Sequence, residues 1–139
     1  MGSIAENLEN VRARIAAAAR RAGRDPGRVR LAAVTKSCPI EAARAAIAAG
    51  ALDLAENRVQ EAQAKFPALA AESPGGAARP RFHLIGHLQT NKAKLAAQLF
   101  DWIHSVDSAR VGEALDRACK ALNRESINIL IQVNISGED

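Results

Sequence analysis

The sequence of 139 residues predicts one α/β domain, covering residues 1–139, built around a parallel β-sheet. Its hydrophobic share of 48% and charged share of 24% are typical of a globular chain. After a first helix, segments with strand character alternate with segments with helix character along the rest of the chain. Such alternation is produced by parallel strands joined through crossover helices. No internal repeat and no change of composition indicates a second domain.

The first expected helix covers residues 3–23. Ser3 is placed to cap its N-terminus, and Glu6 stands three residues later as the capping-box partner. Gly23 ends the helix, because glycine readily adopts the left-handed conformation that follows a helix C-terminus. Apolar residues recur at helical spacing between these ends: Leu8, Val11, Ile15 and Ala18.

The remaining segments follow from apolar runs and the residues that interrupt them. Strands are expected at 29–35, 52–55, 82–85, 102–105 and 127–135. Helices are expected at 39–49, through 59–66, at 90–99 and at 108–122. Pro39 suits the first turn of its helix, and residues 73–80 have the composition of a loop.

Five parallel strands are compatible with two architectures. They could form a doubly wound sheet, or the first part of a (β/α)₈ barrel, which needs eight strands and about 250 residues. In an incomplete barrel the first and last strands would leave unpaired backbone groups at the sheet edges. We therefore expect the 139-residue chain by itself to self-associate, to exchange strands or to fold poorly.

Charge and cysteine usage narrow the functional classes. The net charge of +4 arises in residues 1–30, which hold seven arginines and three acidic residues, while residues 31–139 balance to zero. This pattern favours a solvated helix face over a nucleic-acid surface, and no apolar run is long enough to cross a membrane. Cys38 and Cys119 lack metal-ligand spacing, so no metal site is expected. Reduced thiols in a chain without a secretory signal indicate the cytoplasm.

Polar residues stand at the end of each expected strand, at the edge where parallel α/β proteins bind ligands. They are Lys36, then Glu56, Asn57 and Arg58, then His87 after Gly86, then Ser105 and Asp107, and finally Asn134 and Ser136. Lys36 follows a strand of small apolar residues, which would partly desolvate its amine and favour the neutral, nucleophilic form. A lysine that extends from the strand end into water is the alternative interpretation.

The other polar residues can also be interpreted as having structural roles without any catalytic or binding function. His83 and His104 lie within expected strands, where buried histidines commonly bond to the backbone. The nearness of His104, Ser105 and Asp107 in sequence is weak support for a hydrolase, because a triad requires closeness in space. Lys92 and Lys94 flank a helix start and could contact an anion or simply be solvated.

Five segments of the chain resemble the YggS-type family of pyridoxal 5′-phosphate (PLP) homeostasis proteins. They are LAAVTK at 31–36, ENRVQE at 56–61, HLIGHLQTNK at 83–92, FDWIHSVD at 100–107 and IQVNISGED at 131–139. The segments occur in the family's order, and the longer ones are specific. The resemblance implies a (β/α)₈ TIM barrel of the alanine racemase N-terminal domain type, of which this chain would form about five strands.

The resemblance also implies a set of cofactor-binding residues. Lys36 would hold PLP as an internal aldimine, and Asn57 would lie near the cofactor. The same mouth would be lined by His83, Ser105 and Asn134. The family usually has Gly where this chain has Ala55, and often Tyr where it has Arg58. Ala55 would narrow the approach to the cofactor ring, and Arg58 would change the charge beside it.

The family implied by the resemblance buffers and delivers PLP rather than turning over a substrate, with PLP-dependent apo-enzymes as recipients. A racemase-like PLP enzyme is the alternative, and an interaction module using the arginine-rich first helix is a third hypothesis. The resemblance places the cofactor's phosphate-binding loops beyond residue 139. We therefore expect this chain alone to bind PLP weakly or not at all, and the full-length protein to bind it well as a monomer.

Overall fold

The computed structural model describes residues 2–72 and 79–137. Five strands form one sheet in the order β1-β2-β3-β4-β5, and every neighbouring pair is parallel. The strands are β1 (Ala32–Val34), β2 (Asp53–Glu56), β3 (Arg81–Leu84), β4 (Trp102–Val106) and β5 (Asn128–Ile131). The predicted parallel α/β sheet is therefore confirmed.

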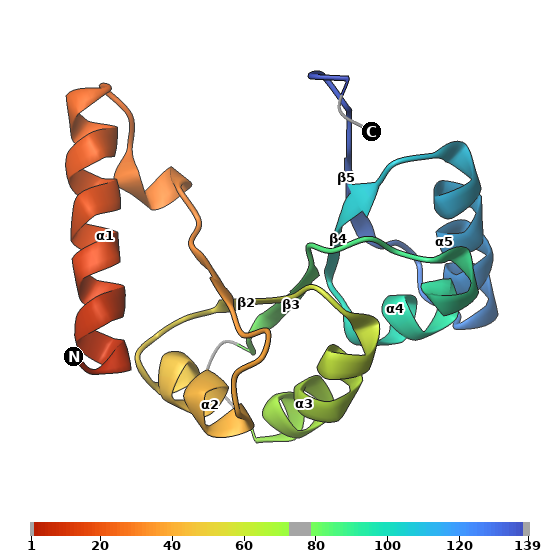
Figure 1. Ribbon diagram of the computed structural model, residues 1–139, viewed down its shortest axis with the longest axis horizontal. Helices are drawn as coiled ribbons and strands as arrows, with labels where there is room; N and C mark the ends of the chain where they lie inside the picture. Colours follow the sequence, from red (N-terminus) through yellow and green to blue (C-terminus); the bar gives the residue numbers. More distant parts are fainter. Residues whose placement is uncertain (1, 73–78, 138–139) are drawn as a thin grey trace.

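The strand order distinguishes between the two architectures that the sequence left open. Each crossover leads to the next strand on the same side, as in the wall of a barrel, whereas a doubly wound sheet reverses its order at a switch point. Figure 1 shows the helices α2 (Ile40–Ala48), α3 (Val59–Ala71), α4 (Ala93–Leu99) and α5 (Ala109–Ala121) following one another along one side of the sheet. The structure thus forms an incomplete barrel wall with β1 and β5 at its two edges.

The first helix, α1 (Ile4–Arg21), has the cap that the sequence predicts. The backbone N–H of Glu6 donates to Ser3 Oγ at 3.2 Å, and the Ser3 N–H donates to Glu6 Oε2 at 2.7 Å. Gly23 follows the helix with a φ of 65°, as expected for its role in ending it. Figure 1 shows α1 beyond α2, at the β1 end of the sheet.

The core lies between the sheet and helices α2 to α5. One face of the central strands supplies Leu54, Phe82, Leu84 and Ile103, all at most 1% exposed. The ring of Phe66 from α3 stacks on Phe82 with centroids 4.1 Å apart. Because side chains alternate along a strand, the opposite face carries a different set of residues, many of them polar.

Several predicted boundaries differ from the structure. The last strand ends at Ile131 rather than at 135, since the final ladder bond joins the Gln132 N–H to the Val106 carbonyl at 2.9 Å, where β4 also ends. The first strand is shorter than expected, β1 covering Ala32–Val34, and it is preceded by a 3₁₀ turn, η1 (Pro26–Arg28), capped by Asp25. The expected helix at 90–99 begins as a second 3₁₀ turn, η2 (Thr90–Lys92). Most of the loop expected at 73–80 lies outside the described residues.

Candidate functional site

The carboxyl ends of the strands form a polar rim, with Lys36 beside the end of β1. The Lys36 side chain is exposed, and its amine has no hydrogen-bond or ion-pair partner among the described residues. Of the two interpretations of Lys36, the lysine that extends into water is therefore confirmed, and the partly desolvated amine is wrong for this chain. In the described sheet β1 is an edge strand with β2 as its single neighbour, and Val34, two residues before Lys36, is itself 45% exposed. Exposure leaves the amine accessible to a ligand at this rim.

The backbone beside Lys36 is held by a buried polar network. Glu56 at the end of β2 is fully buried, and its Oε1 accepts hydrogen bonds from Thr35 Oγ1 and Lys65 Nζ, each at 2.8 Å. Lys65 Nζ also donates to the Thr35 carbonyl at 2.8 Å. Sequence reasoning missed Lys65. The signal was a carboxylate at the end of an apolar strand, which requires a partner when it is buried.

Asn57 follows Glu56 and lies against Gly86 at the exit of β3. A Cβ atom on Gly86 would lie 2.2 Å from the Asn57 carbonyl oxygen, so only glycine fits this approach. The Gly86 carbonyl also accepts a hydrogen bond from Ser105 Oγ at 2.6 Å. A β-bulge between Ile103 and Val106 adds one residue to β4 around Ser105. The hydroxyl of Ser105 is thus occupied by the Gly86 carbonyl and stabilises the backbone of the rim at that position.

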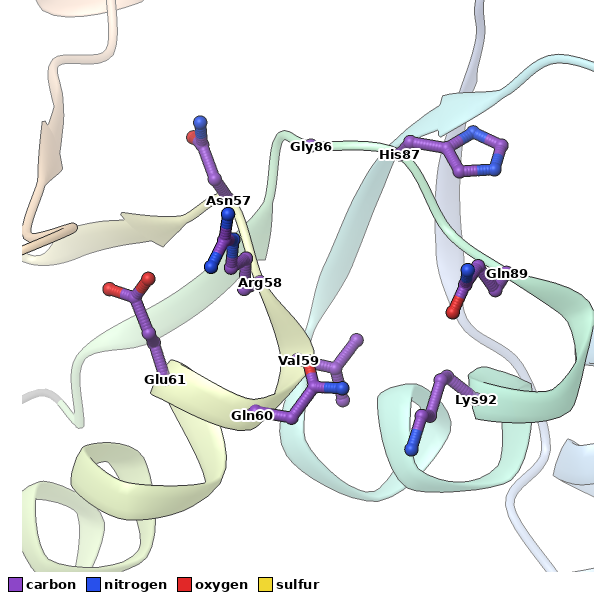
Figure 2. A pocket seen from close by; sticks show the side chains of 9 residues that line it. All are labelled: Asn57, Arg58, Val59, Gln60, Glu61, Gly86, His87, Gln89 and Lys92. Carbon is purple, nitrogen blue, oxygen red and sulfur yellow. The ribbon is translucent and has the colours of Figure 1, made fainter.

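A groove of about 600 Å³ lies on this rim, between the start of α3 and η2. In Figure 2, Gln60 and Lys92 approach it from opposite sides, and Gln89 lies above Lys92. Asn57 points upward, away from the floor of the groove, and Glu61 points away toward the other side of α3. Gln60, Gln89 and Lys92 have no side-chain partner among the described residues. The groove can therefore offer polar contacts to a small ligand.

His83 and Asn134 are not brought next to Lys36. His83 is buried on the sheet face opposite the core, and its Nε2 lies 2.8 Å from Asp53 Oδ1 at the amino end of β2. Asn134 follows β5, at the opposite edge of the sheet from Lys36, and its Oδ1 accepts from the Gly137 N–H at 2.9 Å. The assignment of His83 and Asn134 to one cofactor mouth stays a prediction.

Asp53 is the centre of a second polar cluster, near the amino ends of the strands. Burial acts to raise the pKa of Asp53, but hydrogen bonds from Arg81, Arg30 and His83 outweigh it and hold this pKa well below its usual range. In neutral His83, Nε2–H donates to Asp53, so Nδ1 is left to accept from His104 Nε2 at 3.0 Å. Burial, with a smaller contribution from His83, lowers the pKa of His104.

A metal-binding cluster and a membrane-spanning helix are both absent from the described residues. No group of three or more His, Cys, Asp or Glu side chains within residues 2–72 and 79–137 is arranged to hold a metal ion. In the same ranges, every helix is too short or too polar to cross a bilayer. His104, Ser105 and Asp107 form no triad, because Ser105 Oγ bonds to Gly86 and His104 bonds to His83.

Comparison with known proteins identifies relatives along the whole chain. A pyridoxal phosphate homeostasis protein of Pseudomonas aeruginosa is 44% identical over 138 residues, covering 99% of this chain and 57% of the relative. The protein of that name from Escherichia coli K12 is 42% identical over 142 residues, covering 100% of this chain and 58% of the relative. The chain therefore spans somewhat more than half the length of these relatives.

Solved structures agree with these sequence matches. The structure of PipY from Synechococcus elongatus, determined with PLP bound, matches with a TM-score of 0.78 at 41% identity, covering 97% of this chain and 56% of PipY. A protein of Bifidobacterium adolescentis matches with a TM-score of 0.89 at 40% identity, covering 98% of this chain and 56% of that one. The family model of the alanine racemase N-terminal domain matches residues 7–138. The chain thus belongs to the alanine racemase N-terminal domain family, and pyridoxal phosphate homeostasis proteins are among its relatives.

Proposed function

We propose that this chain carries the PLP-anchoring part of a pyridoxal phosphate homeostasis protein, with Lys36 as the anchoring residue. The observation that carries the proposal is the free, exposed amine of Lys36 at the carboxyl edge of β1. Relatives that match almost the whole chain bear that name, and PipY has been solved with PLP bound. In barrels of this kind, the carboxyl edge is where ligands bind.

The rim offers an aldehyde cofactor an accessible primary amine, that of Lys36. When bound, PLP supplies a reactive aldehyde and an electron-withdrawing ring. Lys36 offers an amine that can bond to the aldehyde carbon while the carbonyl oxygen leaves as water. Lys65 cannot act in this way as it stands, since the buried carboxylate of Glu56 binds its amine. Asn57 stands on the neighbouring strand end and can contact a ligand held by Lys36.

Selective trapping on Lys36 tests the proposal. The chain has five lysines, and Lys94 is an exposed lysine on α4 that serves as an internal reference. After incubation with PLP and reduction by borohydride, peptide mapping should find the pyridoxyl group on Lys36 in preference to Lys94. Lys36→Ala should abolish the preferred site, and Lys94→Ala should leave it unchanged. Equal labelling of both lysines in the unaltered chain would overturn the proposal.

Retention of unreduced PLP measures how much of the site this chain contains. We expect weak retention, because the resemblance places the phosphate-binding loops outside residues 1–139. Gel filtration of the PLP-treated chain should therefore remove most of the absorbance of the bound cofactor. A chain that keeps stoichiometric PLP through gel filtration would show that residues 1–139 hold the cofactor without those loops.

We further propose that the whole protein stores and delivers PLP in the cytoplasm, with PLP-dependent apo-enzymes as recipients, and does not act as a racemase. The curated relatives are named for homeostasis rather than for a reaction, which supports this choice. A racemase-like enzyme would exchange the α-proton of an amino acid with deuterium oxide. The PLP-loaded protein should show no such exchange above the rate of free PLP, and clear exchange would favour the racemase alternative.

A further inference from the structure

The backbone on the amino side of Lys36 is fixed through Thr35. The Thr35 N–H donates to the Ala55 carbonyl at 2.9 Å, and its hydroxyl donates to Glu56. Its carbonyl accepts from both Lys65 Nζ and the Cys38 N–H, at 2.8 Å and 3.2 Å. Thr35 is 5% exposed, so these bonds are largely shielded from water. Every polar group of Thr35 therefore has a partner, and the position from which the lysine side chain starts is set.

The backbone on the carboxyl side of Lys36 is fixed by α3, the helix that also carries Lys65. The Ser37 N–H donates to Glu61 Oε2 at 3.0 Å, and Ser37 adopts a φ of 57°, a left-handed conformation that a serine rarely takes. Glu61 and Lys65 are four residues apart on α3, which places them on one face of the helix. One helix face thus reaches the peptide before Lys36 through Lys65 and the peptide after it through Glu61.

We propose that Glu61 and Lys65 of α3, with the buried Glu56, are positioning residues that determine where Lys36 presents its amine to an aldehyde ligand. This inference rests on the proposed function of Lys36. The side chain of Lys36 itself has no partner among the described residues, so its placement depends on its backbone alone. Left-handed backbone at Ser37 costs free energy, and the Glu61 bond opposes its relaxation to a commoner conformation.

Lys65 gains a second role from the same contacts. Its side chain is 12% exposed, and its amine is bound between Glu56 Oε1 and the Thr35 carbonyl. A bound, protonated ammonium is not a nucleophile. The network therefore keeps the amine of Lys65 from reacting with the ligand, while it fixes the backbone that presents Lys36 at the rim.

Glu61 gives the sharpest test, because its bond to Ser37 is exposed and its removal leaves the core intact. The variants are Glu61→Ala, which removes the acceptor, and Glu61→Gln, which keeps an oxygen that can accept from the Ser37 N–H. Gln63→Ala, at an exposed position of the same helix, is the matched control. Circular dichroism should show the same helix content in all of them.

The first measurement is independent of PLP. Loss of the Glu61 bond should speed amide hydrogen exchange at Ser37 about five-fold, the factor that corresponds to a net hydrogen bond of about 1 kcal/mol. The variants Glu61→Gln and Gln63→Ala should stay within about two-fold of the unaltered chain. If exchange at Ser37 does not change in Glu61→Ala, then Glu61 does not hold this peptide and the inference is overturned.

The second measurement links the bond to the ligand. In the PLP and borohydride experiment, Glu61→Ala should lower the ratio of labelling at Lys36 to labelling at Lys94 by about five-fold, and Glu61→Gln should restore it. An unchanged ratio together with faster exchange at Ser37 would overturn the positioning role. If the unaltered chain shows no preference for Lys36, the proposed function fails, and the exchange data alone still decide whether Glu61 holds the Ser37 peptide.

Discussion

Gly86 offers a direct test of the close approach between β2 and β3 at the rim. In Gly86→Ala, the added Cβ would lie 2.2 Å from the carbonyl oxygen of Asn57 and 2.9 Å from its carbonyl carbon and Cα. These are backbone atoms, so relief requires the chain itself to move. The Gly86 carbonyl is also bonded to buried Ser105, which resists that movement. We expect a loss of about 1–3 kcal/mol in the free energy of unfolding, the usual range for overpacking.

Gly112 provides a matched control, because the change in the free energy of unfolding should have the opposite sign. It lies inside α5, and an added Cβ there meets nothing within 4 Å. Gly112→Ala should therefore stabilise the chain by about 1 kcal/mol, because alanine is the better helix former. Urea unfolding followed by circular dichroism gives both values from the shift of the midpoint at constant slope. A Gly86→Ala variant as stable as the unaltered chain would show that the backbone at Asn57 leaves room for a Cβ atom at position 86 and would refute this reasoning.

Three further predictions concern the second polar cluster and the sheet edge. Asp53→Ala should lower the free energy of unfolding by about 1–3 kcal/mol, since it leaves the buried Nε2 of His83 without a partner; urea unfolding measures it. The pKa of His104 is lower in the folded chain than its usual 6.5, so the unfolded chain binds more protons and stability should fall as pH drops below about 6.5. In His104→Gln this fall should be smaller, and an unchanged slope of stability against pH would exclude His104 as its source. Ile131, 75% exposed on edge strand β5, should promote concentration-dependent self-association, and sedimentation of Ile131→Lys should show less of it.

Local patterns predicted the elements well. The capping box of Ser3 and Glu6 depends on residues three apart, and it forms as expected. The strands and helices follow from short apolar runs, and the differences are confined to their ends. The last strand stops at Ile131 because its partner β4 stops, which is a property of the neighbouring strand and not of the residues at 132–135. An edge strand such as β5 forms ladder hydrogen bonds to one neighbouring strand, so its length is limited by the length of that neighbour, here β4.

The chemistry of the rim was only partly accessible from the sequence. Strand ends correctly placed Lys36, Asn57 and Gly86 on one edge, because parallel strands share that edge. The exposure of Lys36 could not be read in this way, since it depends on which strands flank β1. Ser105 is directed onto the Gly86 carbonyl at a β-bulge, and a bulge shifts the alternation that a sequence pattern assumes.

The two ends of the sheet differ in how their polar groups are used. At the amino ends, the carboxylate of Asp53 accepts hydrogen bonds from Arg30, Arg81 and His83, so these polar groups are paired with one another. At the carboxyl edge, Lys36 and Asn57 have no side-chain partner within the described ranges 2–72 and 79–137. Barrels separate stability and function along the strand axis in this way, with ligands bound at the carboxyl face. The polar side chains at the amino ends are held for stability, whereas Lys36 and Asn57 at the carboxyl edge are held only by their backbone, which leaves their amine and amide groups available to a ligand.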